Sequence, residues 1–188
     1  PPEKIIQKAF VVYEPQKVPL IKKLLKETPY KNALIFCSRK QTVKQLTREL
    51  NQGGFTIAEI YSDLEQNERE SVLSAFTAGR IPVLVATDIL SRGIDIDTID
   101  VVINYDVPGD GEDYVHRIGR TARAEADGAA FTLIGEREQN KFAAIEQLLE
   151  KEVEKVPVPK ELGEAPVYSP RHRKGGDRNP RKNFHSRG

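Results

Sequence analysis

Residues 82–88 read Pro82-Val83-Leu84-Val85-Ala86-Thr87-Asp88, an apolar run that ends abruptly in a hydroxyl and a carboxylate. Successive side chains of a β-strand point to opposite faces of its sheet, so this run is apolar on both faces and must be covered on both sides. The runs Ala33–Cys37 and Val101–Ile103 have the same character, and segments with apolar residues at helical spacing lie around them. This alternation predicts an α/β fold, a doubly wound parallel sheet with helices on both faces.

The same patterns divide the chain into expected elements. We expect strands at 5–13, 33–37, 56–61, 82–86, 101–103 and 129–134, and the sequence allows an edge strand at 153–158. We expect helices around 19–25, 43–50, 65–78, 110–122 and 136–151. In such folds ligands bind outside the carboxyl ends of the strands. The candidate site segments are therefore 38–40, 62–63, 87–95 and 106–123.

The composition of the chain changes near its end. The length of 188 residues favours one compact domain. From residue 160 onward the sequence is rich in Gly, Pro, Arg, Lys, Asn and Ser, so we expect a folded domain at 1–158 and a flexible, disordered basic tail at 159–188. Seven Lys or Arg and one Asp give residues 171–188 a net charge of +6, and the whole chain carries +1, which leaves −5 for residues 1–170. A polyanion is the expected partner of the tail, with a protein partner as the alternative.

Several classes of protein and site are not expected. No apolar run has the roughly 18 residues of a membrane span, and no signal peptide is visible, so no membrane association is expected. The single Cys37 allows neither an internal disulfide nor a thiolate metal cage, and a reducing cytoplasm is its natural setting. His116, His172 and His185 form no spaced metal set, so no metal site is expected. The chain contains no Met, which suggests a piece of a longer protein.

Cationic side chains are concentrated in residues 114–123, which read Tyr-Val-His-Arg-Ile-Gly-Arg-Thr-Ala-Arg. If the segment is helical, His116, Arg120 and Arg123 project within about 60° of one another, and Arg117 points to a neighbouring quadrant. Positive groups on one face repel unless an anion lies in front of them, and the planar fork of arginine suits phosphate oxygens. The alternative is a basic surface helix balanced by the acidic residues on either side of it.

Residues 87–95 begin where a buried strand ends. The hydroxyl of Thr87 is placed to donate to a phosphate oxygen, and Asp95 is placed to accept hydrogen bonds from sugar hydroxyls. Gly93 permits a sharp turn between Arg92 and Asp95. The alternatives are that Asp88 caps a short helix and that Asp95 pairs with a nearby arginine.

The helix expected at 65–78 also begins with polar residues. Asp63 is the expected N-cap, with Gln66 three residues later in a start that resembles a capping box. Gln66 and Arg69 share a face near the positive end of the helix, where a backbone phosphate is favoured. The alternative is a surface ion pair of Arg69 with Glu65 or Glu70. No phosphate-binding glycine loop and no nucleophilic triad is recognisable.

Together these segments resemble, in order and spacing, the motifs of the C-terminal RecA-like domain of DEAD-box RNA helicases. The similarity covers about residues 5–155. The form His-Arg-Ile-Gly-Arg-Thr-Ala-Arg is specific, because the related DEAH group usually begins this motif with Gln. The sequence around 106–124 is most similar to the bacterial RhlE-like subgroup. The motifs are Ala33–Lys40, Tyr61–Arg69, Val85–Asp95, Val102–Pro108 and Tyr114–Arg123.

The resemblance implies the second motor domain of an ATP-dependent RNA helicase and a role for each matching residue. Arg120 and Arg123 would be arginine fingers that reach the γ-phosphate of ATP. His116 and Arg117 would connect their helix to the DEAD segment of the partner domain and to the motif around Asp95. Asp95 would contact the ribose, and Gly93 would belong with it to the cofactor-binding residues and also lie along the RNA path. The RNA backbone would be contacted, with little sequence preference, by Arg39, Gln66, Arg69, Thr87 and Arg92.

The same resemblance implies a partner domain. No Walker A loop and no Asp-Glu-Ala-Asp occurs in the sequence, so ATP with Mg²⁺ would be held mainly by the N-terminal RecA-like domain. We expect this chain alone to be monomeric and inactive. Tyr61-Ser62-Asp63 stands where the family commonly has His-Gly-Asp, and Ala124-Glu125 where it often has Ala-Gly. The alternatives are a non-catalytic RNA-binding or annealing module and the domain of a double-stranded DNA translocase.

Overall fold

A seven-stranded sheet forms the centre of the computed structural model, which describes residues 5–87, 99–118 and 128–171. The strand order is β3-β4-β2-β5-β6-β1-β7, and every pairing between neighbours is parallel. This confirms the predicted doubly wound parallel sheet. The strands are β1 (Ile5–Val12), β2 (Ala33–Phe36), β3 (Ile57–Ile60), β4 (Val83–Ala86), β5 (Val101–Asn104), β6 (Gly128–Gly135) and β7 (Glu154–Lys155).

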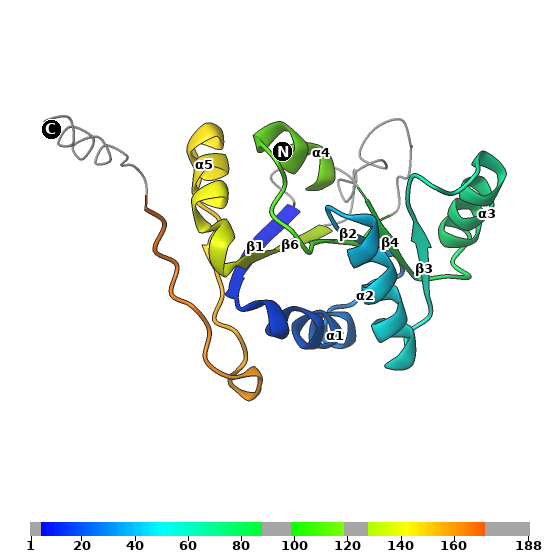
Figure 1. Cartoon of the computed structure of the whole chain (residues 1–188), viewed down its shortest axis with the longest axis horizontal. Coiled ribbons are helices and arrows are strands. Elements are labelled where there is room, and N and C mark those ends of the chain that lie inside the picture. The colour runs from blue at the N-terminus through cyan, green and yellow to red at the C-terminus, as the bar shows by residue number, and fades with distance from the viewer. Residues whose placement is uncertain (1–4, 88–98, 119–127, 172–188) are drawn as a thin grey trace, which may run out of the picture.

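Five α-helices are described, and they cover both faces of the sheet (Figure 1). They are α1 (Lys17–Glu27), α2 (Lys40–Gln52), α3 (Gln66–Thr77), α4 (Gly111–Ile118) and α5 (Gln139–Leu149). Short 3₁₀ helices occupy Glu14–Gln16, Glu136–Glu138 and Lys160–Leu162. Each α-helix lies within or close to a segment in which the apolar spacing predicted one.

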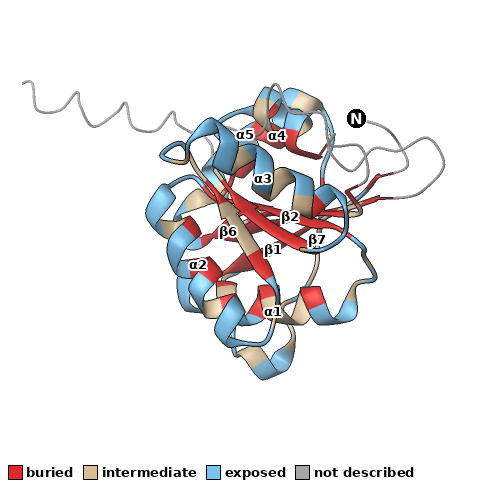
Figure 2. Ribbon diagram, turned by 90° about the vertical axis from the view of Figure 1, so that its right-hand side faces the viewer, coloured by how far each residue is buried: buried red, intermediate tan, exposed pale blue. Residues whose placement is uncertain are grey.

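The core consists of separate apolar layers on the two faces of the sheet. In β2, Ile35 packs with α1 and α2, whereas Leu34 and Phe36 pack with α3 on the opposite face. The β1–β6 half of that opposite face is covered by α4 and α5. Figure 2 shows the buried residues concentrated in the strands and the exposed residues on the outer sides of the helices. The strands are apolar on both faces because helices cover both faces of the sheet, as the sequence indicated.

Residues 159–171, here called the C-terminal strap, correct one expectation. The sequence placed the start of a flexible tail at 159, but the strap packs against the folded body. The side-chain amide of Gln16, which is buried, donates to the carbonyls of Leu162 at 3.0 Å and Glu164 at 2.8 Å. Tyr168 Oη donates to Glu146 Oε1 at 2.8 Å. Composition misses this docking because polar contacts with buried partners hold the strap, and it has few apolar residues to bury.

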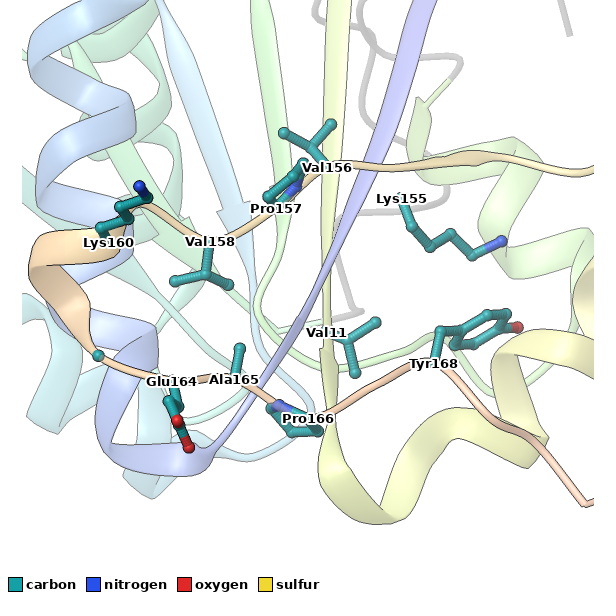
Figure 3. Close-up of a pocket in the computed structure, with 11 residues that line it drawn as sticks. Val11, Lys155, Val156, Pro157, Val158, Lys160, Glu164, Ala165, Pro166 and Tyr168 are labelled. Atoms are coloured by element: carbon teal, nitrogen blue, oxygen red, sulfur yellow. The ribbon is translucent and has the colours of Figure 1, made fainter.

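A cavity of about 610 Å³ lies between the strap and the β1–β7 edge of the sheet. Val11 of β1 lies between the two arms of the chain, with Lys155–Val158 on one side and Glu164–Tyr168 on the other (Figure 3). The predicted edge strand at 153–158 is confirmed only at Glu154 and Lys155. Residues 172–188, the rest of the predicted tail, lie outside the described part of the chain.

Tyr168→Phe should lower the free energy of unfolding by about 1 kcal/mol at neutral pH, because it removes one hydrogen bond to a carboxylate. Burial, and next the hydrogen bond to Glu146, raise the pKa of Tyr168 above its ordinary value. Because the pKa of Tyr168 is higher in the folded state, its protonated hydroxyl stabilises the fold below the unfolded-state pKa. This contribution is lost as the pH rises through the folded-state pKa. The difference between the wild type and the variant should therefore shrink from about pH 10 upward. Urea unfolding of both proteins over a pH series measures this difference in the free energy of unfolding. A difference that does not change with pH contradicts the expectation.

Candidate functional site

The predicted site segments meet at the carboxyl ends of neighbouring strands. Backbone hydrogen bonds join the strand ends directly: Cys37 N donates to Ala86 O at 2.9 Å, and Thr87 N donates to Ile60 O at 3.3 Å. Because β3, β4 and β2 are adjacent in the sheet, the segments that follow them form one continuous rim. The structure therefore brings the segments of Arg39 and Thr87 together, as the topology predicted.

The segment after β2 presents a cation at this rim. Arg39 is the N-cap residue of α2, and its side chain is exposed. No ion pair of Arg39 occurs within the described part of the chain. Thr87 is partly exposed, and its amide is used by the bond to β3. An exposed guanidinium and a neighbouring hydroxyl are suited to phosphate oxygens.

The start of α3 lies in the segment after β3. The sequence predicted Asp63 as the N-cap of this helix, and that prediction is wrong. Glu65 is the N-cap, and its backbone N–H donates to Glu68 Oε1 at 3.0 Å in a capping box. Asp63 instead pairs with Lys40 at the start of α2, which ties the segments after β2 and β3 together. This hydrogen bond raises the pKa of Lys40.

Gln66 and Arg69 lie one turn apart at the start of α3. Arg69 Nη2 donates to Leu64 O at 3.4 Å, and Arg69 Nε is buried with no hydrogen-bond partner. The alternative for Arg69, an ion pair with Glu65 or Glu70, is not found among the described contacts. Gln66 is exposed and donates to Glu70 at 3.0 Å. Arg69 is partly exposed and has no ion pair among the described residues, so the accessible part of its guanidinium can meet an anion at the rim.

The two described cations of α4, which the helical projection pointed in different directions, have different environments. His116 is exposed, whereas Arg117 is 0% exposed. Arg117 Nη1 donates to Asn104 Oδ1 at 3.0 Å and to Asp106 O at 3.3 Å, and its guanidinium carbon lies 5.0 Å from the centre of the Phe36 ring. This burial does not fit the predicted contact of Arg117 with a partner domain. It makes Arg117 an internal tie between α4 and the end of β5.

Gly111, the first residue of α4, lies close to α5. A Cβ atom at Gly111 would lie 2.4 Å from Leu148 Cδ2, so a larger residue would require the exposed Leu148 side chain to move aside. Asp110 Oδ1 accepts the amide of Asp113 at 2.8 Å and so caps the start of α4. Together these contacts fix the position of the helix that carries His116.

Lys17 is a residue at this rim that the sequence did not single out. It is the first residue of α1 and only 1% exposed, and its Nζ donates to Tyr105 O at 2.9 Å. Its ammonium lies 3.1 Å from a carboxylate oxygen of Glu14 and 3.8 Å from oxygens of Asp106 and Glu138. A lysine at a helix start is ordinarily exposed, so no pattern in the sequence indicates this burial. Only the packing of α1 against the end of β5 reveals it.

Asp106 links the segment after β5 to the segment after β2. Its Oδ2 accepts the amide of Ser38 at 2.6 Å, next to Arg39. Burial, and next the charge of Glu14, raise the pKa of the neighbouring Tyr105, which keeps its hydroxyl neutral. The rim is therefore a connected network, and its strand ends do not move independently.

Some predicted site residues lie outside the described part of the chain: Arg92, Gly93, Asp95, Arg120 and Arg123. Among the described residues no group of three or more His, Cys, Asp or Glu could hold a metal ion. The same described part contains no helix long and apolar enough to cross a membrane. The rim therefore has donors for an anion and no described site for Mg²⁺.

Comparisons with known proteins agree with this geometry. Residues 16–125 match the family described as "Helicase conserved C-terminal domain". The chain is 44% identical over 154 residues to "DEAD-box ATP-dependent RNA helicase 14" of Arabidopsis thaliana, covering 81% of this chain and 25% of that relative. The chain thus spans about a quarter of the length of the curated relatives it matches.

Two solved structures show the same fold. The E. coli DEAD-box protein SrmB, bound to regulator of ribonuclease activity A, has a TM-score of 0.80 and 30% identity, with 88% of this chain and 99% of that chain covered. S. cerevisiae Dbp5 bound to RNA and ADP BeF3 has a TM-score of 0.78 and 30% identity, with 85% and 43% covered. The predicted RecA-like architecture is confirmed.

Proposed function

Because the chain belongs to the family of helicase C-terminal domains, in its DEAD-box branch, we propose that it is the second motor domain of an ATP-dependent RNA helicase. The observation that carries this proposal is the rim at the ends of β2, β3 and β4. There Arg39, Arg69 and Thr87 present donors on adjacent segments, and neither arginine has an ion pair within the described part of the chain. Phosphate and sugar contacts of this kind bind RNA with little sequence preference. Gln66 and Arg92 complete the proposed RNA path.

The proposed nucleotide site lies on the side of α4. ATP with Mg²⁺ supplies the phosphoryl group that is transferred to water, and the N-terminal RecA-like domain of the same protein holds it. The residues of this chain fit the anionic part of that group, because His116 is exposed beside a segment that carries Arg120 and Arg123. Positioned guanidinium groups stabilise the charge that develops on a transferred phosphoryl group. Asp95 and Gly93 are proposed to border the ribose.

The burial of Arg117 modifies the role that the family resemblance implies for it. Its donors are directed at Asn104 and the carbonyl of Asp106 within this domain. We assign it to holding α4 in place, so that its neighbours in the sequence can face the nucleotide. A contact with the motif around Asp95 stays a prediction.

The alternative functions have less support than an RNA helicase. The relatives are named as RNA helicases, which favours neither a non-catalytic RNA-binding or annealing module nor a DNA translocase. They come from plants and yeasts, so the RhlE-like placement rests only on the sequence around 106–124. A basic tail that binds RNA through residues 171–188, a monomeric state and a cytoplasmic location also stay proposals.

RNA-stimulated ATP hydrolysis by the full-length protein tests the proposed function. We expect single-stranded RNA to stimulate hydrolysis and double-stranded DNA to have no effect. We also expect the 188-residue chain alone to hydrolyse no ATP, because its sequence contains no Walker A loop. Stimulation by DNA alone would support the translocase, and hydrolysis by the purified chain would contradict the composite site.

A further inference from the structure

The end of β5 is held from both faces of the sheet. On the face of α1, Lys17 Nζ binds Tyr105 O at 2.9 Å. On the face of α4, Arg117 Nη1 binds Asn104 Oδ1 and Asp106 O at 3.0 and 3.3 Å. Three consecutive residues of the strand end are therefore fixed by two buried cations. Movement of the backbone at Tyr105 or Asp106 would change the acceptor geometry of Arg117.

The electrostatics of this contact show that Lys17 is more than a packing residue. Its ammonium has three carboxylates around it, those of Glu14, Asp106 and Glu138, and it lies 4.5 Å from the centre of the Tyr105 ring. Burying a charge is unfavourable unless it is paired and hydrogen-bonded, as it is here. Without the ammonium, the Tyr105 carbonyl loses its donor and the carboxylates repel one another.

The backbone around Asp106 is the element through which that repulsion acts. Val107 N donates to Glu138 Oε2 at 3.1 Å, so the loop is tied to the carboxylate cluster itself. If the cluster spreads, Asp106 O moves with the loop. Arg117 then loses one of the two acceptors that residues 104–106 provide for it. The sequence runs directly from Ile118 at the end of α4 into the segment with Arg120 and Arg123.

We propose that Lys17 is a positioning residue of the motor, which holds the end of β5 so that Arg117 can fix α4 and its cationic extension. This inference rests on the proposed function. Lys17 contacts neither nucleotide nor RNA in this role, and it acts through the backbone of residues 105–106. Its removal should therefore slow the chemical step and leave the affinity for RNA unchanged.

Lys17→Met in the full-length protein tests this, because Met keeps the length of the side chain and removes the ammonium. We expect kcat for RNA-stimulated ATP hydrolysis to fall about ten- to hundredfold, with RNA affinity unchanged. Lys26→Met is the matched control: Lys26 is exposed on the same helix, and the change in charge is identical. The assay temperature is kept well below the melting temperature of both variants. A lowered melting temperature with unchanged kcat would show a merely structural role and overturn the inference.

A double-mutant cycle tests the route through Arg117. If Lys17 acts through it, Lys17→Met and Arg117→Lys are non-additive in kcat, whereas Lys26→Met and Arg117→Lys are additive. Additive effects of the first pair overturn the inference. Should Lys17→Met not fold, Lys17→Gln removes the same ammonium with a polar side chain, and an unchanged kcat then counts against the inference. Absence of ATP hydrolysis in the wild type would instead refute the proposed function.

Discussion

Arg120→Ala or Arg123→Ala in the full-length protein should lower kcat for RNA-stimulated ATP hydrolysis by about 10³-fold or more. The expected cause is loss of a guanidinium that stabilises the charge on the transferred phosphoryl group, a stabilisation present in the transition state. RNA affinity should change little, because the proposed RNA contacts lie on other segments. Steady-state kinetics and fluorescence-anisotropy titration with a labelled RNA measure the two effects separately.

Arg48→Ala is the matched control for this loss. Arg48 is exposed on the surface of α2, and its substitution by Ala removes the same charge. It should leave kcat unchanged. If either finger variant lost RNA affinity in proportion to its activity, the residue would belong to the RNA path. If both kept full activity, the proposed composite nucleotide site would be wrong.

Phe76→Ala should lower the free energy of unfolding of the 188-residue chain by about 3–5 kcal/mol. Phe76 is 0% exposed and is the one residue of α3 that is fully buried among those described. Its carbonyl accepts the side-chain amide of the buried Asn32 at 2.9 Å, which fixes the same end of the helix. Loss of the ring leaves a cavity beneath α3. Urea unfolding followed by circular dichroism measures the change.

The same substitution should also weaken RNA binding, because α3 carries Gln66 and Arg69 at its other end. Phe76→Leu, which retains most of the buried volume, is the control and should lose clearly less in both measurements. A destabilised Phe76→Ala protein that binds RNA with wild-type affinity below its unfolding transition would show that the cavity does not displace Gln66 and Arg69.

Patterns along the chain were sufficient to predict the architecture. The strands are apolar on both faces and alternate with amphipathic helices, and that combination has few compact solutions other than a covered parallel sheet. The rule that ligands gather at the carboxyl ends of such strands then identified the segments of Arg39 and Thr87 from the sequence. Helical geometry predicted that His116 and Arg117 point in different directions, but it did not predict the burial of Arg117.

Details of the rim depended on which residues meet in space. Asp63 was expected to cap α3, but Glu65 does so, because Lys40 from the start of α2 pairs with Asp63. The strap was expected to be flexible, yet the Gln16 side chain donates hydrogen bonds to two of its carbonyls. In each case the deciding partner is distant in the sequence, and local patterns contain no information about it.

The sequence by itself determined the layered α/β fold, the edge at which the site lies and the residue types that mark a helicase motor domain. Periodicity and residue chemistry are local properties, so they can be read along the chain. The tertiary structure alone decided that Lys17 and Arg117 are buried and hold the end of β5 from opposite faces. Whether a charged side chain is solvated or paired depends on the groups that packing brings around it, and those come from α1, β5 and α4 together.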